Sequence, residues 1–419
     1  MSGERLDVSG DSYHQIRRQI LREINAESAL AMPLSEIEAA VARIVAGSVR
    51  EQRLFLNQIE QRRLTREIVD DMVRLGPLQA LMDDIDVSDI MVNGPRQVFV
   101  ERHGRLQATE QRFRDAEHLM NLAQRIASGV GRRIDEASPM VDARLPDGSR
   151  VNIIAPPLAL DGACISIRKF ARQTITLDRL AEFGSLSPRM GDFLRIAARA
   201  RLNILVSGGT GSGKTTLLNA LSQHIDPQER IVTIEDAAEL RLQQPHVVRL
   251  ETRPPSLEGK GEVTQRDLLK NALRMRPDRI LLGEVRGAEA FDMLQAMNTG
   301  HDGSLSTLHA NSPDDAVLRL ENMLNMGSIS MPSSLIRRQL ASALDLLVQV
   351  ERMADGRRRV TSISEVRPQG HDDLICVPLF TWEAGAARHL ACGHWPNFDE
   401  KLQAAGVLAA CREVLNVRA

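Results

Sequence analysis

Apolar residues recur along this chain at spacings that change from one region to the next. In residues 13–80 they return every three or four positions, as at Ile16, Ile20 and Ile24. This period is typical of amphipathic helices whose charged residues lie on the solvated face. We therefore expect an N-terminal helical region of residues 1–76, which begins with a disordered tail in its first ten or so residues.

The spacing shortens after Gly76-Pro77-Leu78, where the helical pattern ends. Short runs rich in β-branched residues follow, and they are separated by Asn-Gly and Pro-Asp-Gly turns that are typical of hairpins. The predicted strands are 89–92, 98–101, 140–145, 150–154 and 163–168, with a helix between the cap Asp115 and residue 128. Residues 77–172 are thus predicted to form a small α+β domain with an antiparallel sheet.

The apolar runs become continuous in the second half of the chain. The runs lie at 204–206, 231–234, 279–283 and 303–308. They alternate with helical segments, which favours buried parallel strands in an α/β domain. The predicted parts are a linker with a short helix at 173–186, an α/β domain at 187–370 and a C-terminal extension at 371–419.

Composition narrows the class of protein. The chain has 419 residues, of which 43% are hydrophobic and 26% charged, so we expect a globular protein of several domains. A net charge of −2 and an aromatic content of 3% do not favour nucleic-acid binding, which needs basic and stacking surfaces. The four cysteines form no C-x-x-C pair, and no apolar run is long enough for a membrane span. A cytoplasmic protein without a structural zinc site is therefore expected.

One glycine-rich stretch stands between a predicted buried strand and a predicted helix. It reads Gly208-Gly209-Thr210-Gly211-Ser212-Gly213-Lys214-Thr215, is followed by Thr216, and agrees with G-x4-G-K-[ST]. Its glycines let backbone N–H groups face an anion, and the helix adds its positive end. Lys214 can reach the β- and γ-phosphates, while the Thr215 hydroxyl can hold Mg²⁺. We therefore predict that the stretch binds a nucleoside triphosphate and is not a plain turn.

Acidic and histidine side chains follow the other predicted parallel strands. Glu235, Glu284 and His309 each stand at the end of one strand, and such ends meet at one edge of a sheet. Glu235 or Glu239 is expected to polarise the attacking water, although an acidic loop that caps the next element is the alternative. Glu284 is expected to hold Mg²⁺ through water, and His309 to sense the γ-phosphate. His301 precedes its strand, and the sequence leaves open whether it is a site residue or a loop histidine.

Three arginines of the small domain have two possible roles. Arg144 and Arg150 flank the Pro-Asp-Gly turn, and Arg168 ends the last predicted strand. By pattern alone they keep a hairpin soluble, but the same residues can supply positive charge to a triphosphate as arginine fingers. The run Arg357-Arg358-Arg359 is explained better by a charged hairpin turn than by a nucleic-acid patch.

Four motifs of the α/β domain occur in a recognisable order, at 208–215, 233–240, 283–286 and 303–312. They resemble the Walker A, Asp box, Walker B and His box of the ATPases shared by type II and type IV secretion systems. The resemblance extends over about residues 70–370. The tetracysteine metal domain of many type II enzymes is absent from the sequence.

Motifs of the small domain resemble one branch of these ATPases. Residues 89–94, 141–150 and 166–170 are similar to the Tad/Flp pilus assembly branch, the CpaF-like ATPases. The sequence departs from some branches at Gly287, where they carry an Asp after the arginine.

This resemblance implies a RecA-like P-loop domain in a ring-shaped homo-hexamer, with ATP and Mg²⁺ bound between the small domain and the RecA-like domain. It implies that Glu235 is the catalytic glutamate, that Glu284 is the Walker B acid, and that His301 and His309 are His-box residues. It also assigns nucleotide contacts to three arginines, across domains or subunits. These are Arg144, Arg150 and Arg168.

The resemblance further implies a motor that docks on an inner-membrane platform protein and associates peripherally with the membrane through it. ATP turnover would drive the assembly or the retraction of a Tad/Flp type IV pilus, or would drive a related secretion machine. Two other classes of function remain open. One is a nucleic-acid translocase or conjugation-type ATPase on the same fold, and the other is a nucleotide-binding scaffold that does not hydrolyse ATP.

Overall fold

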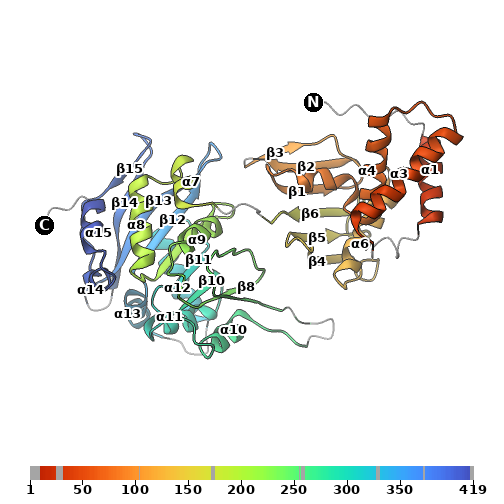
Figure 1. Ribbon diagram of the computed structural model, residues 1–419. Helices are drawn as coiled ribbons and strands as arrows, with labels where there is room; N and C mark the ends of the chain where they lie inside the picture. Colours follow the sequence, from red (N-terminus) through yellow and green to blue (C-terminus); the bar gives the residue numbers. More distant parts are fainter. Residues whose placement is uncertain are drawn as a thin grey trace. The chain divides into compact units, whose positions relative to one another are not determined.

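The computed structural model describes residues 10–24, 32–102, 104–170, 175–253, 255, 260–326, 331–370 and 373–415. The chain forms two compact units, Met1–Arg172 and Gln173–Ala419, which are coloured red to yellow and yellow-green to blue in Figure 1. The predicted N-terminal tail lies outside the described residues except for Gly10, which begins the first helix. Each unit has its own buried core.

The first unit begins with helices α1 (Gly10–Glu23), α3 (Leu34–Glu51) and α4 (Gln58–Val73). Their apolar faces share a core that includes Ile16, Ile20, Ile37, Val41, Val45, Leu64 and Ile68. Helix α4 starts with a capping box, in which the Asn57 side chain accepts the Glu60 N–H and the Glu60 carboxylate accepts the Asn57 N–H. The helical period of the sequence therefore predicted this region correctly.

The rest of the first unit is an antiparallel sheet with the strand order β3-β2-β1-β6-β5-β4. Its elements are η1 (Gly76–Leu78), α5 (Gln79–Asp83), β1 (Val87–Asn93), β2 (Gln97–Arg102), β3 (Arg105–Ala108), α6 (Ala116–Gly129), β4 (Met140–Arg144), β5 (Arg150–Ile154) and β6 (Cys164–Arg168). Residues such as Ile90, Val151 and Ile165 share one core with Leu119 and Leu122 of α6. The predicted α+β class of this region is confirmed.

Helix α4 is held on this sheet domain by polar contacts. The Asp71 carboxylate accepts hydrogen bonds from His118 Nε2 at 3.1 Å and from Arg114 at 2.9 Å. The Arg125 guanidinium donates to the carbonyl oxygens of Asp71 and Arg74. These carbonyls lie at the end of α4, where a helix leaves its last carbonyl groups without intrahelical partners. The helices and the sheet thus form one unit.

The second unit is built on a sheet with the strand order β15-β14-β13-β12-β7-β11-β10-β8-β9. The strands from β12 to β9 in this order are parallel, while β13, β14 and β15 are antiparallel. Their bounds are β7 (Ile204–Gly208), β8 (Ile231–Glu235), β9 (Val247–Glu251), β10 (Arg279–Val285), β11 (Leu305–Leu308), β12 (Leu346–Arg352), β13 (Arg358–Gln369), β14 (Asp373–Glu383) and β15 (Arg388–Ala391). The continuous apolar runs became β7, β8 and β11, which are buried throughout.

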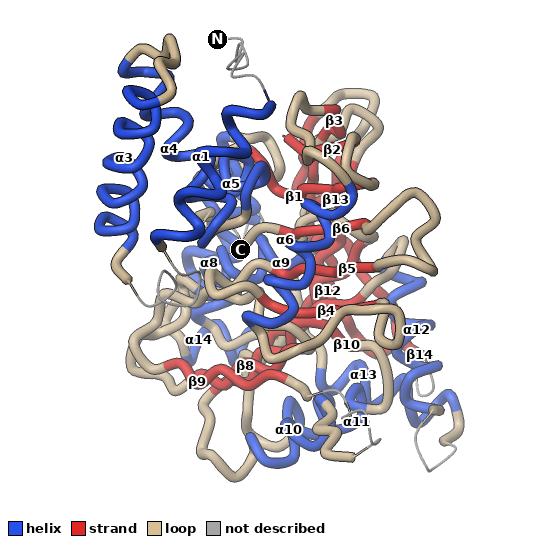
Figure 2. The backbone as a smooth tube through the Cα atoms, turned by 90° about the vertical axis from the view of Figure 1, so that its right-hand side faces the viewer, coloured by secondary structure: helices blue, strands red, loops and turns tan. Residues whose placement is uncertain are grey.

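Helices cover both faces of this sheet. One face carries α7 (Leu177–Glu182), α8 (Pro188–Arg199), α9 (Lys214–Ser222), α14 (Asp399–Ala404) and α15 (Leu408–Leu415). The other carries α10 (Gln265–Ala272), α11 (Glu289–Asn298), α12 (Pro313–Asn325) and α13 (Ser333–Ala343). Helices α10, α11 and α13 lie together in both Figure 1 and Figure 2. A parallel sheet covered on both faces is the predicted α/β class, which is therefore confirmed.

The predicted C-terminal extension, of which residues 373–415 are described, contributes to the core of the second unit. Its strands β14 and β15 continue the sheet beyond β13, and its helices pack beside α8. Leu402, Cys411 and Leu415 are fully buried in the same core as Phe193. Residues 373–415 are therefore part of the second unit's core and sheet.

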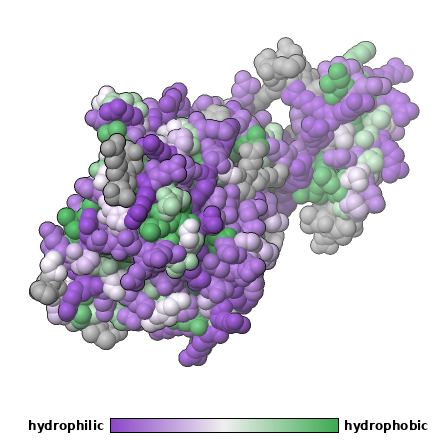
Figure 3. Space-filling view, turned by 60° about the vertical axis from the view of Figure 1, so that its left-hand side comes forward, coloured by the Kyte–Doolittle hydropathy of each residue, from purple (hydrophilic) through white to green (hydrophobic). Residues whose placement is uncertain are grey.

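The face of the molecule in Figure 3 is mostly hydrophilic, with apolar side chains exposed in small groups. Large apolar residues that are exposed in the described parts of the chain include Phe55, Leu106, Leu160 and Leu318. Among the helices described here, none combines the length and the apolar composition needed to cross a bilayer.

Candidate active site

The predicted site residues of the second unit lie on four neighbouring strands. The glycine-rich stretch 208–215, called the P-loop below, follows β7, and His309 follows β11. Glu284 lies near the end of β10, and Glu235 ends β8. The sheet order places these strands side by side as β7-β11-β10-β8. Because the four strands are parallel, their carboxyl ends form one edge, as the sequence predicted.

Two glycines of the P-loop are required by its backbone. A Cβ atom at Gly208 would lie 2.1 Å from the Val350 carbonyl oxygen and 2.6 Å from Ser212 Oγ, so no side chain fits there. Gly213 has φ +101° at the N-cap of α9, a conformation that glycine adopts without strain. The loop therefore needs glycine in order to turn back on itself before the helix begins.

Lys214 lies inside the loop. Its Nζ donates to the carbonyl oxygens of Gly208 at 2.9 Å and Gly209 at 3.0 Å, and it lies 3.5 Å from His309 Nε2. Burial lowers the pKa of Lys214, although the Glu284 carboxylate opposes that shift. Thr215 and Thr216 follow in the first turn of α9, next to the helix N-terminus.

Glu284 is held by two side chains. Its Oε1 lies 3.1 Å from His309 Nε2, and its Oε2 accepts a hydrogen bond from Arg286 at 2.8 Å. Burial, followed by the charge of Lys214, lowers the pKa of His309. When a neutral His309 carries its hydrogen on Nε2, that N–H donates a hydrogen bond to the Glu284 carboxylate. The predicted metal ligand and the predicted sensor therefore contact each other directly.

A bulge in β10 sets the direction of Glu284. Leu282 is paired with Ser306, and the next pair is Val285 with Leu308, so β10 uses one residue more than β11 over this step. Such a bulge changes the alternation of side chains, and it commonly lies next to active sites. The Thr307 hydroxyl donates to the carbonyl oxygen of Gly283 at 2.6 Å and fixes the bulge.

Glu235 is buried at the end of β8. Its Oε1 accepts the backbone N–H groups of Glu239 at 2.8 Å and Leu240 at 2.9 Å. Its Oε2 is also buried and finds no hydrogen-bond partner within the described part of the chain. Burial raises the pKa of Glu235 to about 7, despite the two backbone hydrogen bonds. The side chain packs on Gly283, where a Cβ atom would lie 2.8 Å from Glu235 Cγ.

His301 lies at the opposite edge of the same sheet. It precedes β11, whereas His309 follows it, and the strand runs parallel to β7. Its Nδ1 lies 3.3 Å from the Ala296 carbonyl oxygen, and its own carbonyl accepts the Ser304 hydroxyl. Within the second unit, the structure therefore separates His301 from the cluster around Lys214.

The three predicted arginines come together on the sheet of the first unit. Arg144 is paired with Arg150 across β4 and β5, and Arg150 is paired with Arg168 across β5 and β6. Residues directly opposite each other in antiparallel strands project from the same face. Arg168 also pairs with Asp89 of β1 through Nε at 3.2 Å. The result is a row of three arginines at one end of three strands.

A family model described as "Type II/IV secretion system protein" matches residues 71–376. This chain belongs to the type II/IV secretion system protein family. A putative conjugal transfer protein of Mycobacterium tuberculosis is 41% identical over 335 residues, which cover 78% of this chain and 94% of the relative. The type IV secretion system protein PtlH of Bordetella pertussis is 42% identical over 306 residues, which cover 66% of this chain and 90% of the relative.

Solved structures from this group of ATPases are also similar. The VirB11 ATPase of the Brucella suis type IV secretion system, in complex with sulphate, is 33% identical and covers 70% of this chain and 96% of its own, with a TM-score of 0.38. The pilus retraction motor PilT, with bound ADP, is 19% identical and covers 81% of this chain and 89% of its own, with a TM-score of 0.50. The latter similarity concerns the fold.

The side chains of this secretion-family member fit a nucleotide and Mg²⁺. Gly208 and Gly213 give the P-loop a tight turn in front of α9, and the buried Ser212 Oγ lacks a hydrogen-bond partner among the described residues. Thr215 and Glu284 are oxygen donors, the kind of ligand that Mg²⁺ takes in proteins. The unpartnered Glu235 Oε2 is available to a water molecule. The site thus combines a phosphate loop, oxygen ligands and a potential base.

Two arginines at this edge were not among the predicted site residues. Arg286 contacts both Glu284 and Asp236, and Arg358 Nε donates to the Gly211 carbonyl oxygen at 2.9 Å. Arg286 lies within the stretch 283–286 that resembles a Walker B motif, so its position was a usable signal. Arg358 belongs to the basic hairpin and reaches the P-loop through tertiary structure. Arg359 packs over Trp382 and donates to the Gly184 carbonyl.

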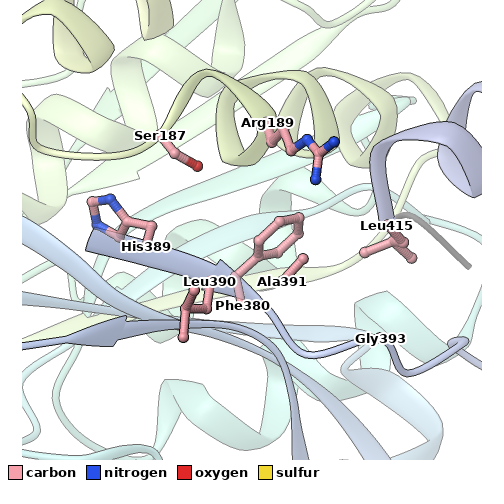
Figure 4. A pocket seen from close by; sticks show the side chains of 8 residues that line it. All are labelled: Ser187, Arg189, Phe380, His389, Leu390, Ala391, Gly393 and Leu415. Atoms are coloured by element: carbon pink, nitrogen blue, oxygen red, sulfur yellow. The ribbon is translucent and has the colours of Figure 1, made fainter. Parts of the chain in front are cut away.

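A separate pocket of about 260 Å³ lies near the antiparallel end of the sheet (Figure 4). It is lined by residues of α8, β14, β15 and α15. The Ser187 hydroxyl at its rim caps α8 by accepting the Met190 N–H, and His389 Nε2 lies 3.1 Å from the Val360 carbonyl oxygen. Both of these polar groups thus already serve the fold, and we assign the pocket no ligand.

Proposed function

We propose that this protein is an ATPase motor that hydrolyses ATP to drive the assembly or retraction of a type IV pilus of the Tad/Flp class. It works as a homo-hexamer at the cytoplasmic face of the inner membrane, where a platform protein of the secretion machine holds it. Membership in the secretion family supports the general class. The motifs at 89–94, 141–150 and 166–170 favour the Tad/Flp branch.

The observation that carries the proposal for hydrolysis is the environment of Glu235. Binding of a nucleotide alone needs the P-loop, but not a buried carboxylate at the same edge of the sheet. Glu235 combines two backbone hydrogen bonds on one oxygen with a second oxygen that lacks a partner among the described residues. Its pKa of about 7 suits a general base, because a base works best when its pKa lies near the operating pH.

Each residue of the cluster has a role in this scheme. The P-loop N–H groups and Lys214 bind the phosphates, and Glu235 accepts a proton from the attacking water. Thr215 and Glu284 hold Mg²⁺, which neutralises phosphate charge when it is bound. His309 keeps Glu284 oriented, and it lies close enough to Lys214 to respond when that amine engages a phosphate.

The row of Arg144, Arg150 and Arg168 supplies the remaining positive charge. We propose that these arginines reach the nucleotide from the small domain of the same subunit or of a neighbour in the ring. Mixing of two inactive variants, Lys214→Ala and Arg150→Gln, separates these cases. If Arg150 acts between subunits, mixed rings contain some complete sites and regain activity. No recovery indicates action within one subunit.

The direct test is phosphate release by the wild-type protein with Mg²⁺ and ATP, with Lys214→Ala as the negative control. Native mass is measured in parallel, with and without nucleotide. We expect turnover together with a hexamer mass. A ring that binds ATP without turnover favours the scaffold function, and a monomer under every condition contradicts the ring and the arginine roles.

A conjugation-type ATPase is the second candidate. The Mycobacterium tuberculosis relative is named as a putative conjugal transfer protein and is 41% identical. Addition of single-stranded DNA to the same assay distinguishes the two functions. Strong stimulation that disappears with added salt favours the conjugation-type function, and no stimulation favours the pilus motor.

A further inference from the structure

Arg286 bridges two of the acidic strand ends at the site. It follows β10 directly, and one of its nitrogens donates to Glu284 Oε2 at 2.8 Å. Another nitrogen donates at 3.2 Å to Oδ2 of Asp236, which follows Glu235 at the end of β8. Strands β8 and β10 are direct neighbours, so the guanidinium connects the end that carries the proposed base to the end that carries the proposed metal ligand.

The backbone of Arg286 is fixed as well. Its N–H donates to Glu289 Oε1 at 2.6 Å, and the N–H of Gly287 donates to the same oxygen at 2.7 Å. Glu289 is the first residue of α11. The turn between β10 and α11 is therefore folded around one carboxylate, and the Arg286 side chain starts from a defined point even though it is 59% exposed.

The hydrogen bonds to Glu284 leave room for a metal-bound water. An ionised carboxylate offers about four acceptor positions, two on each oxygen. Arg286 uses one on Oε2 and His309 one on Oε1, so two positions remain. Two donors on different oxygens also define the plane of the carboxylate, which a single donor does not.

We propose that Arg286 is a positioning residue that orients Glu284 for Mg²⁺ and ties it to the β8 strand end through Asp236. This inference rests on the proposed function of Glu284 as a metal ligand. The role needs arginine because a planar fork can donate to two carboxylates at once, whereas the lysine ammonium is a point charge. Arg286 therefore acts through Glu284, and it does not itself contact the reacting atoms.

The test measures how nucleotide binding depends on Mg²⁺, without hydrolysis. A fluorescent ADP analogue is held at fixed concentration while Mg²⁺ is titrated into wild-type protein and Arg286→Gln. We expect the half-saturating Mg²⁺ concentration to rise about tenfold in the variant, as is typical when a partner of a metal ligand is removed. Binding of the analogue without metal is expected to stay unchanged.

Two further variants separate charge from geometry. Arg286→Lys keeps the positive charge but loses the planar guanidinium. Its half-saturating Mg²⁺ concentration is therefore expected to stay well above that of the wild-type protein. Asp236→Asn weakens the contact between Arg286 and the β8 strand end. Its half-saturating Mg²⁺ concentration is expected to lie between those of wild type and Arg286→Gln. The matched control is Arg388→Gln, because Arg388 is 64% exposed and pairs with Glu383 at the far edge of the same sheet.

An unchanged Mg²⁺ requirement in a folded Arg286→Gln protein overturns this proposal, and so does full recovery in Arg286→Lys. If thermal melting shows that Arg286→Gln does not fold, Asp236→Asn replaces it in the test. An unchanged Mg²⁺ requirement in a folded Asp236→Asn protein then overturns the proposal. If the wild-type protein binds the ADP analogue equally well with and without Mg²⁺, the result contradicts the role of Glu284 in the proposed function and not the role of Arg286. The two failures are therefore distinguishable.

Discussion

The two edges of the parallel sheet in the second unit both carry a lysine among carboxylates, yet they differ in how their polar groups are paired. At the amino ends of the strands, Lys401 donates to Asp345 at 2.7 Å and to Asp302 at 3.0 Å. The buried Asn203 side chain donates to the Ala343 carbonyl and accepts the N–H of Gly303. Their hydrogen bonds thus connect side chains and backbone that belong to the fold.

The carboxyl ends differ. Glu235 Oε2 and Ser212 Oγ are buried without a partner among the described residues, and Lys214 binds carbonyl oxygens of its own loop. Leaving a buried polar atom unpaired costs about 1–3 kcal/mol, so a fold keeps such atoms where a ligand or water supplies the partner. At the other edge, Glu365 Oε2 also lacks a hydrogen bond, but Arg367 Nε lies 3.5 Å away as its ion-pair partner.

Charge clusters alone do not reveal a site. Both edges concentrate charged side chains where strands end. The pairing of the polar atoms distinguishes a cluster that holds the fold together from one that is open to a ligand. Five experiments test that distinction.

The largest expected effect is that of Glu235→Gln. Glutamine keeps an oxygen for the N–H groups of Glu239 and Leu240 but cannot accept a proton, so ATP turnover should fall about 10³-fold. Nucleotide affinity should change little, because the P-loop is untouched. Phosphate release and fluorescent-nucleotide binding check the two parts. Unchanged turnover removes Glu235 as the base.

Gly283→Ala is expected to have the next largest effect. Its new Cβ lies 2.8 Å from Glu235 Cγ and 3.3 Å from Oε1, so the carboxylate has to move. A displacement of about 1 Å at a reacting group lowers turnover about 100-fold. Gly385→Ala is the matched control, because nothing lies within 4 Å of a Cβ there. If turnover and melting temperature both stay at wild-type values, the packing of Glu235 on Gly283 is not needed.

At the opposite edge, Lys401→Ala should lower stability and leave the chemistry intact. Asp345, whose side chain is 16% exposed, loses its charged partner, which costs about 2 kcal/mol of unfolding free energy. The melting temperature should fall by roughly 4–8 °C for a unit of this size. Turnover per folded molecule is measured well below that temperature. A loss of turnover there would mean that the two edges are coupled.

The smallest expected effect is the pH dependence of turnover. With a pKa of about 7, raised by burial, Glu235 is mostly ionised at pH 8 and mostly protonated at pH 6. Turnover should therefore fall about tenfold between these values, since only the ionised form accepts a proton. Burial lowers the pKa of His309, so its charging is expected at still lower pH. A flat profile contradicts the base role.

The same shift has a consequence for stability. Between pH 4.5, the ordinary pKa of a glutamate, and about 7, the folded state keeps the Glu235 proton that the unfolded state releases. Stability from this group therefore decreases as pH rises through that interval. Glu235→Gln removes the decrease, so the variant should gain stability relative to wild type at pH 8. Denaturant titrations at pH 5 and pH 8 measure the difference.

Much of the fold could be predicted because it follows from local spacing. Continuous apolar runs gave β7, β8 and β11, and the G-x4-G-K-[ST] motif located the loop between a strand and a helix. Sequence order also predicted that Glu235, Glu284 and His309 meet, since parallel strands align their ends.

Other features could not be predicted, because they depend on partners that are distant in sequence. Arg358 reaches Gly211 through a hairpin that follows it by 147 residues, and no local pattern indicates that contact. The bulge that directs Glu284 is visible only in the register of β10 against β11.

The sequence by itself therefore predicted the fold classes, the parallel strands β7, β8, β10 and β11 with the helices between them, and the chemical types gathered at the strand ends, whereas β12, β13, β14 and β15 were not among the predicted strands. Tertiary structure decided which of those groups are paired and which are open. His301 and His309 are separated by one strand, so they lie at opposite edges. Lys401 and Lys214 both lie near carboxylates, but Lys401 donates to two of them, whereas Lys214 donates to the carbonyl oxygens of its own loop. The physical reason is that pairing depends on distances across the sheet, whereas spacing along the chain fixes only secondary structure.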